Sequence, residues 1–511
     1  MPRRVDLTIS SLPLTLFICG VILSLTFTFP FIEDNIPQAY IARRLLHGEL
    51  PYVGTWDQNY PGVLIVHILA LIIGPSAIAF HIVDVTFQLF MVWVLYSIGS
   101  RLGGKLTGLI AGLLYTMCYV LNGADDLAGQ KDVFAAIALA SAVLVLIRSD
   151  YRATITAGIF AGIAVLIRPT YDLHVIVIAI AIGFAPRDNV IRRVALFLAI
   201  SAVPLCAFCL VYLFAGHLSD FWEATFVFTT SVYNPHPRFA ILLLPSIYLG
   251  SMPILAIMGS VALISDKGHR RDGFLLLGLI AASLLSAILL WGYRYHWQPF
   301  FVFEQLLAAI GIAVLFRFLV VRYIASEWMQ NMAIAVLVLM ILIVNFKGST
   351  MSGVLRDAIH GRLNSQESMY AHFVNDAFDP VGETRLANYV KAKSRPGDRM
   401  ESFYTTVYPQ YIADLQPANR FILTIPLLMR DASGGFTDMQ RRWQKEYTDS
   451  LLLVKPRWFL ISDPKYTSGI GEGGRLPRQM LHETFPQIET MIQELYHPDT
   501  TIGIWTLYER K

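Results

Sequence analysis

Long apolar segments are the feature that most constrains this chain. Segments of about 15 to 25 residues recur between Leu12 and Phe346, and roughly 20 apolar residues suffice for a helix to cross a bilayer. A content of 55% hydrophobic and 15% charged residues agrees with this pattern and excludes an ordinary soluble globule. Hydropathy predicts about eleven crossings, near residues 12–30, 78–99, 105–121, 133–148, 153–167, 173–186, 193–215, 239–264, 273–291, 299–317 and 329–346.

The basic residues predict which side of the membrane each loop faces. The segment 62–74 is too short for a span, so we interpret it as a juxtamembrane or re-entrant helix. Most loop lysines and arginines then fall on one side, which the positive-inside rule assigns to the cytoplasm. The N-terminus accordingly faces the cytoplasm and the C-terminal tail lies outside, as expected for an integral protein of a bacterial inner (cytoplasmic) membrane. The net charge of +3 is ordinary for such loops and indicates no nucleic-acid partner.

The composition changes after residue 346, which predicts two parts. Residues 1–346 form the transmembrane module, with a first outside loop at about 31–77, and residues 347–511 form an extracytoplasmic α/β domain. Helices are expected over 383–393, 439–453 and 480–495, and strands over 400–404, 421–425, 458–462 and 502–508. The fold class is therefore a mainly α polytopic helical bundle with a C-terminal soluble α/β domain.

Polar residues collect in the predicted outside loops. Glu33 and Asp34 directly follow the first apolar run, where a carboxylate near lipid is costly and invites a functional explanation. Short or proline-interrupted segments beside polar groups also indicate a binding cavity. Solvated loop charges and headgroup anchors remain the alternative explanation for several of these residues. The other polar residues of interest are Asp57, Asn59, Tyr60, Asp126, Asp132, Arg168, Arg294, His296 and Gln298.

The first outside loop resembles that of multispanning GT-C type glycosyltransferases that use polyprenyl-phosphate-linked sugars, such as protein O-mannosyltransferases and the lipid A aminoarabinose transferase. The resemblance rests on Glu33-Asp34-Asn35, Tyr40 to Gly48 and Trp56 to Pro61. Three later stretches are similar to family motifs as well, namely Lys131 to Phe134, Gly162 to Thr170 and Tyr295 to Pro299. Two positions depart from the family pattern, because Asn35 stands where Glu is usual and Asn59 where Lys or His is usual.

The resemblance implies an inverting transfer of a sugar to a glycan, lipid or protein acceptor on the outer face. Asp34 matches the catalytic aspartate and would act as general base, with Glu33 in support. Arg168, Arg294, His296 and Gln298 would bind the donor phosphate, since guanidinium groups pair well with phosphate oxygens. Asp57, Asn59, Tyr60, Asp126 and Asp132 would support the site.

Two questions stay open on the sequence alone. Asp34, Asp57 and Asp132, with Glu33, could hold a divalent metal ion through oxygen ligands, so metal use is undecided. A flippase or transporter, or a non-catalytic protein of envelope polysaccharide assembly, is the alternative function. A transporter would carry charges midway along several helices and often shows internal repeats, whereas here the charges gather at one face.

Overall fold

A computed structural model of the chain describes residues 11–32, 34–122, 128–147, 151–184, 189–233, 252–290, 293–324, 326–346, 349–375, 378–462 and 476–511. Helices occupy the described part of every predicted apolar segment. They are α1 (Leu12–Leu23), α4 (Ala77–Gly103), α5 (Lys105–Asn122), α6 (Lys131–Leu146), α7 (Tyr151–Ile167), α8 (Asp172–Gly183), α9 (Val190–Phe214), α12 (Met252–Ser265), α13 (Arg270–Ile288), α14 (Gln298–Phe316) and α15 (Glu327–Phe346).

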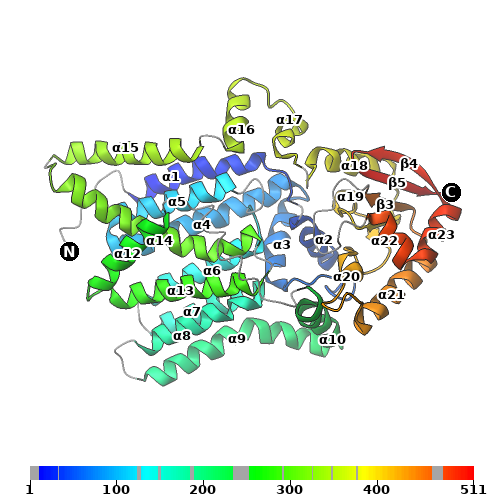
Figure 1. Cartoon of the computed structure of the whole chain (residues 1–511), viewed down its shortest axis with the longest axis horizontal. Helices are drawn as coiled ribbons and strands as arrows, with labels where there is room; N and C mark the ends of the chain where they lie inside the picture. The colour runs from blue at the N-terminus through cyan, green and yellow to red at the C-terminus, as the bar shows by residue number, and fades with distance from the viewer. Residues whose placement is uncertain are drawn as a thin grey trace.

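These helices run side by side along the long axis of the molecule (Figure 1). Four apolar stretches within the described residues are long enough to cross a membrane, namely Ala77–Gly103, Val190–Phe214, Arg270–Ile288 and Tyr295–Val320. The other apolar helices are shorter, so the number of eleven crossings stays a prediction. The chain is an integral membrane protein by its apolar helices and by the fold that it shares with membrane proteins.

Small residues allow the closest helix contact in the bundle. A Cβ atom added at Gly259 of α12 would lie 1.9 Å from the carbonyl oxygen of Leu307 in α14, and one added at Gly311 would lie 2.1 Å from that of Leu255. Glycine at both positions lets the two backbones touch, which is a common solution where van der Waals packing drives helix association.

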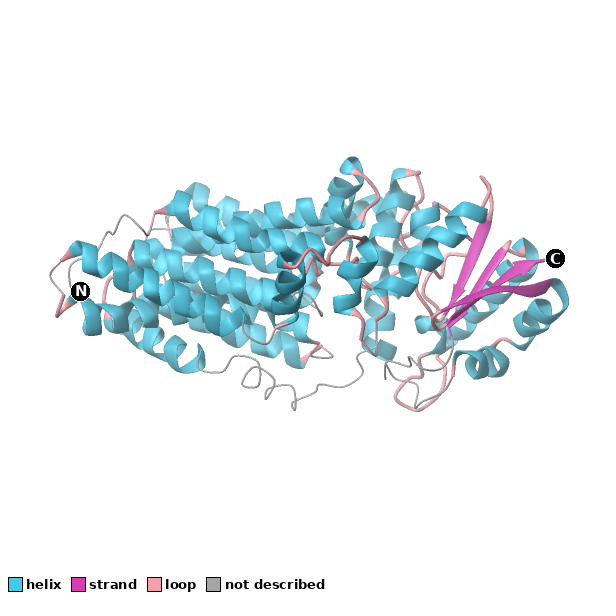
Figure 2. Ribbon diagram, turned by 90° about the horizontal axis from the view of Figure 1, so that it is seen from above, coloured by secondary structure: helices cyan, strands magenta, loops and turns pink. Residues whose placement is uncertain are grey.

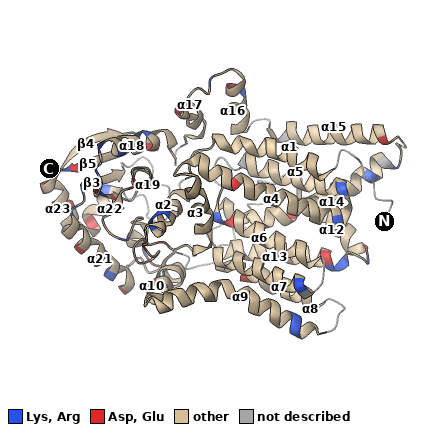
Figure 3. Cartoon of the chain, turned by 180° about the vertical axis from the view of Figure 1, so that it is seen from behind, with Lys and Arg blue, Asp and Glu red and all other residues tan. Residues whose placement is uncertain are grey.

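Lys and Arg positions gather at the end of the bundle away from the C-terminal domain (Figure 3). Several of them bond to helix ends there. Arg101 donates to the Leu144 carbonyl at 3.1 Å and Arg271 to the Ala181 carbonyl at 3.0 Å. Such cations stabilise the negative ends of the helices that they contact.

The C-terminal region folds around a mixed sheet at the opposite end of the molecule (Figure 2). Its strands lie in the order β2-β1-β3-β5-β4, with β1 parallel to β2 and β3, and β5 antiparallel to β3 and β4. Alternate side chains of β3 point to opposite faces, so Trp458 and Leu460 join one apolar cluster and Phe459 and Ile461 another. The strands are β1 (Arg399–Phe403), β2 (Gln416–Pro417), β3 (Trp458–Ser462), β4 (Tyr496–Ile502) and β5 (Trp505–Arg510).

Helices cover both faces of this sheet and extend from it toward the bundle. They include α16 (Thr350–Ile359), α17 (Gln366–Tyr370), α18 (Pro380–Lys393), α19 (Tyr408–Ala413), α20 (Ile425–Leu428), α21 (Asp438–Val454), α22 (Pro477–Thr484) and α23 (Pro486–Leu495). The expected helices 383–393 and 439–453 correspond to α18 and α21, and the expected strands 400–404 and 458–462 to β1 and β3.

One predicted element is absent and two differ in their bounds. Residues 421–425 form no strand, because Phe421 turns into an aromatic cluster with Trp56 and Trp443 instead of a sheet. The expected helix 480–495 is divided into α22 and α23, since Pro486 cannot continue a helix. The expected last strand 502–508 is a hairpin of β4 and β5 that turns near Gly503, whose φ of 59° favours glycine.

The first loop joins the bundle to the C-terminal domain. It contains α2 (Asn35–Leu46), the short helix η3 (Pro61–Val63) and α3 (Leu64–Ile73), the last of which covers most of the segment that we expected not to cross. In α2, Tyr40 donates its hydroxyl hydrogen to the Leu415 carbonyl at 2.7 Å, and Arg43 pairs with Asp414 at 2.9 Å. The two parts of the chain therefore share an interior.

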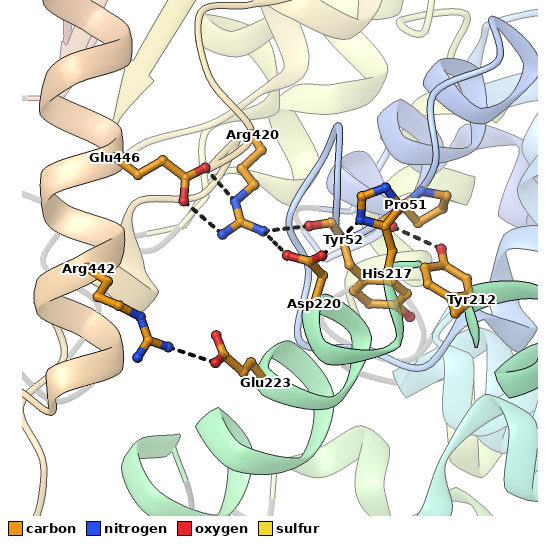
Figure 4. A network of polar contacts seen from close by, with 9 residues as sticks. All are labelled: Pro51, Tyr52, Tyr212, His217, Asp220, Glu223, Arg420, Arg442 and Glu446. Carbon is orange, nitrogen blue, oxygen red and sulfur yellow. Dashed lines mark hydrogen bonds and ion pairs between the residues drawn. The ribbon is translucent and has the colours of Figure 1, made fainter. Parts of the chain in front are cut away.

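A second set of contacts fixes α10 (Leu218–Trp222) and the π-helices η6 (Glu223–Val227) and η7 (Thr229–Tyr233) against the same domain. Arg420 is at the centre of this set (Figure 4). It pairs with Glu446 at 2.7 Å and with Asp220 at 3.1 Å, and it donates to the Tyr52 carbonyl at 3.0 Å. One guanidinium thus joins the first loop, α10 and α21.

Candidate active site

A cavity of about 180 Å³ lies where the bundle, the first loop and the C-terminal domain meet. Polar and charged groups line one part of it, and apolar side chains line the rest. Its walls come from Asp34, Pro37, Gln38, Gln58, Asn59, Tyr60, Lys131, Ile167, Arg168, Pro169, Thr170, Thr225, Thr229, Tyr233, Leu290, Tyr295, His296, Leu423, Ile425 and Pro426.

Asp34 is the carboxylate that faces this cavity. It occupies the N-cap position of α2, yet its side chain makes no capping hydrogen bond. The amide of Gln130 instead donates to Asp34 Oδ2 at 3.1 Å, and the carboxylate is exposed. One oxygen is fixed by a neutral donor, and among the described residues no ion pair to Asp34 is present, so the group is held in place by the Gln130 amide.

Asn59 and Lys131 face each other on a second wall. The Lys131 ammonium donates to Asn59 Oδ1. Asp57 in turn fixes Asn59, because its Oδ1 accepts from the Asn59 amide nitrogen at 2.8 Å and from the Asn59 backbone at 3.1 Å. Burial raises the pKa of Asp57, and the nearby Lys131 charge and the Asn59 bonds oppose that rise. The result is a cation anchored at the cavity wall, with Asp57 behind it.

Arg168 provides a second cation. It follows the last residue of α7 in extended conformation, because Pro169 disfavours continued helix at the preceding residue. Its Nε pairs with Asp132 Oδ1 at 3.0 Å, and the Tyr171 hydroxyl donates to the same oxygen. Both members of the pair are buried, so each needs the other to offset its loss of water.

An aromatic wall completes the polar part of the cavity. The 3₁₀ helix η9 (Arg294–Trp297) presents Tyr295 and His296, whose rings meet edge to face at 4.5 Å between centroids. His296 is buried, and its Nδ1 has no hydrogen-bond partner among the described residues. An imidazole in this position can supply one donor or acceptor to a bound molecule.

Comparison with solved structures identifies the fold of the chain. No protein-family model and no curated protein matches the sequence. ArnT from Cupriavidus metallidurans bound to undecaprenyl phosphate is similar in structure, with a TM-score of 0.60 and 12% identity over 98% of each chain. The archaeal oligosaccharyltransferase AglB from Archaeoglobus fulgidus, in complex with an inhibitory peptide and a dolichol-phosphate, gives a TM-score of 0.56 and 14% identity over 91% of this chain and 71% of AglB. Both are GT-C glycosyltransferases.

The chain has the GT-C fold. At these sequence identities the likeness concerns the fold alone.

Most of the predicted site residues line this cavity or lie directly behind its wall. Asp34, Asn59, Tyr60, Arg168 and His296 line it. Asp57 and Asp132 stand behind that wall and hold Asn59 and Arg168.

Four predicted residues do not belong to the described lining. Gln298 is buried at the first position of α14 and is not among the lining residues. For Arg294 the structure describes only the backbone, at the start of η9. Glu33 and Asp126 lie outside the described residues.

Sequence reasoning assigned no role to Lys131, Gln130 or the C-terminal lining residues Leu423, Ile425 and Pro426. A signal existed for Lys131, because it directly precedes Asp132 in a stretch that carries the resemblance. Leu423, Ile425 and Pro426 gave no signal, since an apolar stretch predicted as a strand is typical of the core of a soluble domain.

The proposed metal ligands do not come together. Among the described residues, no group of three or more His, Cys, Asp and Glu side chains could hold a metal ion. Asp57 bonds to Asn59 and Asp132 pairs with Arg168, while Asp34 alone of the three lines the cavity. These three carboxylates therefore do not form the set of oxygen ligands that the sequence suggested.

Proposed function

We propose that this protein is a membrane glycosyltransferase that moves a sugar from a polyprenyl-phosphate-linked donor to an acceptor on the outer face of the membrane. One observation carries the proposal: a single cavity combines the Asp34 carboxylate with two cations, Lys131 and Arg168. The GT-C fold supports it, because ArnT shares that fold and was solved bound to undecaprenyl phosphate.

Asp34 would act as general base for the acceptor hydroxyl. The hydroxyl oxygen attacks the anomeric carbon of the sugar, the bond from that carbon to the phosphate oxygen breaks, and Asp34 takes the hydroxyl proton. Attack from the face opposite the phosphate inverts the anomeric centre. Gln130 favours this role because it orients the carboxylate through Oδ2, while Oδ1 accepts no bond from the described residues.

Lys131 and Arg168 would stabilise the departing phosphate. As the sugar–phosphate bond breaks, negative charge grows on the phosphate oxygens, and fixed cations beside them lower the barrier. Asp132 engages Arg168 through Nε, and no bond from the described residues to the two terminal guanidinium nitrogens is present, so these would serve as donors for an anion. His296 would add one further contact.

The position of the C-terminal domain supports a role in binding the acceptor. Leu423, Ile425 and Pro426 form an apolar part of the cavity wall that faces the polar part. A glycan, lipid or protein acceptor would pass this wall to reach Asp34. We further propose that residues 347–511 lie outside the cytoplasm and that the N-terminus faces it, because the basic residues gather at the far end of the bundle.

The test is transfer of a radiolabelled sugar from a polyprenyl phosphate by the purified protein. Asp34→Asn should lower kcat by about 10²- to 10⁴-fold, the usual contribution of a general base. Asp449→Asn, at an exposed position of α21 far from the cavity lining, is the matched control and should retain wild-type transfer. Equal transfer by wild type and Asp34→Asn would refute the base assignment. No transfer from any lipid donor would favour a flippase or a non-catalytic assembly protein.

A further inference from the structure

A carboxylate is buried inside the helix bundle, apart from the cavity. Asp84 lies two turns into α4 and is fully buried. Carboxyl groups within membrane helices are costly and usually serve a function. Its oxygens are both bonded: the Tyr119 hydroxyl donates to Oδ2 at 2.6 Å and the Gln88 amide donates to Oδ1 at 2.8 Å. The Tyr115 hydroxyl donates to the side-chain amide oxygen, Oε1, of Gln88.

Tyr119 carries this network to the edge of the cavity. Its hydroxyl oxygen accepts the backbone N–H of Gly129 at 2.8 Å, while its hydrogen points to Asp84. A hydroxyl can donate once and accept as well, so both bonds form together. Because Asp84 accepts the hydrogen, a lone pair of the Tyr119 oxygen stays directed at Gly129.

Gly129 belongs to a segment, residues 128–132, in which every residue makes a long-range contact. Gly129 itself has a φ of 69°, and a Cβ atom there would lie 2.3 Å from the Phe80 ring. The segment can therefore adopt this shape only with glycine at that position. The other contacts are Asn35 to the Ala128 carbonyl at 3.2 Å, Gln130 to Asp34 at 3.1 Å, Lys131 to Asn59, and Asp132 to Arg168 at 3.0 Å.

We propose that Asp84 and Tyr119 are positioning residues for the site. They hold the Gly129 amide, and thereby set where Gln130 and Lys131 meet Asp34 and Asn59. The effect on transfer rests on the proposed function, in which those groups orient the base and bind the phosphate. A displacement of about 1 Å at such groups can cost on the order of 10²-fold in rate.

The chain supplies a matched control for this proposal. Tyr115 lies one helical turn before Tyr119, is buried to the same degree, and also donates to the network. Its partner is Gln88, and it makes no contact with residues 128–132 among the described bonds. Tyr115→Phe and Tyr119→Phe each remove one buried hydroxyl from α5, so a purely structural network predicts similar losses from both.

The first measurement is hydrogen exchange of the purified full-length protein in lipid nanodiscs, and it needs no activity. The peptide that contains residues 128–132 should exchange at least tenfold faster in Tyr119→Phe than in wild type, and at the wild-type rate in Tyr115→Phe. Equal exchange in the two variants would overturn the proposal.

The second measurement is transfer kinetics with a radiolabelled polyprenyl-phosphate sugar. Tyr119→Phe should lower kcat about tenfold, and Tyr115→Phe should lower it less than twofold. The kcat of Asp84→Asn should lie between those of Asp84→Ala and wild type, because asparagine keeps one acceptor oxygen. Gln130→Ala should cost little more in the Tyr119→Phe background than Tyr119→Phe costs alone, because both act through one contact. Additive losses would refute the positioning role. If wild type transfers no sugar, the proposed function fails, and the exchange result still decides whether Tyr119 holds the segment.

Discussion

Lys131 gives the sharpest test of how the cavity would handle a phosphate. Members of the GT-C superfamily that the first loop resembles usually carry a basic residue where this chain has Asn59. Here the Lys131 ammonium lies against the Asn59 side chain, although the two residues are 72 positions apart. Under the proposed function, the start of α6 would supply the cation that the resemblance implies at position 59.

The magnitude follows from charge and distance. Two unit charges about 4 Å apart interact by about 4 kcal/mol at an effective dielectric constant of about 20. Removing one fixed donor from a developing oxyanion costs about 10²- to 10³-fold in kcat. Arg168 remains in Lys131→Met, so we expect the lower end, a fall in kcat of about 10²-fold. Asn59→Ala keeps the ammonium but removes its anchor and one donor to Asp57, and should cost about tenfold in kcat.

The decisive variant moves the charge back to the first loop. Asn59→Lys combined with Lys131→Asn restores one ammonium and one amide to the same contact from opposite sides. This double variant should recover transfer to within about tenfold of wild type, since the cation returns to nearly the same place. The assay is transfer of radiolabelled sugar over a range of donor concentrations, with Lys391→Met on the exposed face of α18 as the control for loss of a lysine.

Two results would refute this reasoning. Wild-type kcat and donor KM in Lys131→Met would mean that the ammonium does not face the phosphate. Failure of the double variant, with folding intact by size exclusion and thermal unfolding, would mean that Lys131 acts by something other than its charge at this contact.

Two further predictions concern the C-terminal domain. Burial raises the pKa of Glu401 from its ordinary 4.5 to about 8. The folded domain therefore keeps a proton that the unfolded chain releases above pH 4.5. The free energy of unfolding should fall as the pH rises from about 5 to 8. The melting temperature should depend less on pH across this range in Glu401→Gln than in wild type, and as in wild type in the exposed control Glu494→Gln. Identical pH profiles for the two variants would contradict the raised pKa of Glu401. Arg420→Ala removes the ion pairs with Glu446 and Asp220, and should raise acceptor KM about tenfold and lower the melting temperature by a few degrees. Arg395→Ala, an exposed arginine, should change neither quantity.

The sequence predicted local structure well wherever one physical signal dominates. The predicted apolar runs became helices in their described parts, and the continuous apolar run of Trp458–Ser462 became β3. It failed where a distant partner decides the outcome. The run Phe421–Ile425 has the composition of a strand, but Phe421 packs against Trp56 of the first loop and the run pairs with no strand of the sheet.

The same limit applies to the candidate site. Asp34 and Arg168 could be selected because a carboxylate at a helix end and an arginine before a proline are locally unusual. Gln130 could not, since its contact with Asp34 joins residues 96 positions apart. Asp84 is a similar case, because a lone acid in an apolar helix gives no hint that Tyr119 and Gly129 lie beside it.

The contact between Tyr40 and Leu415, made across 375 positions, has a consequence for biosynthesis. The ribosome delivers the bundle first, and the residues that line the remaining wall, Leu423, Ile425 and Pro426, emerge after it. Domains fold as units in the order in which they are made. A half-made chain would therefore sit in the membrane with its cavity open on one side. In the orientation proposed above, the cavity closes only after the region that holds these residues has been translocated and folded, so a chain truncated before residue 423 would insert into the membrane and still lack a complete site.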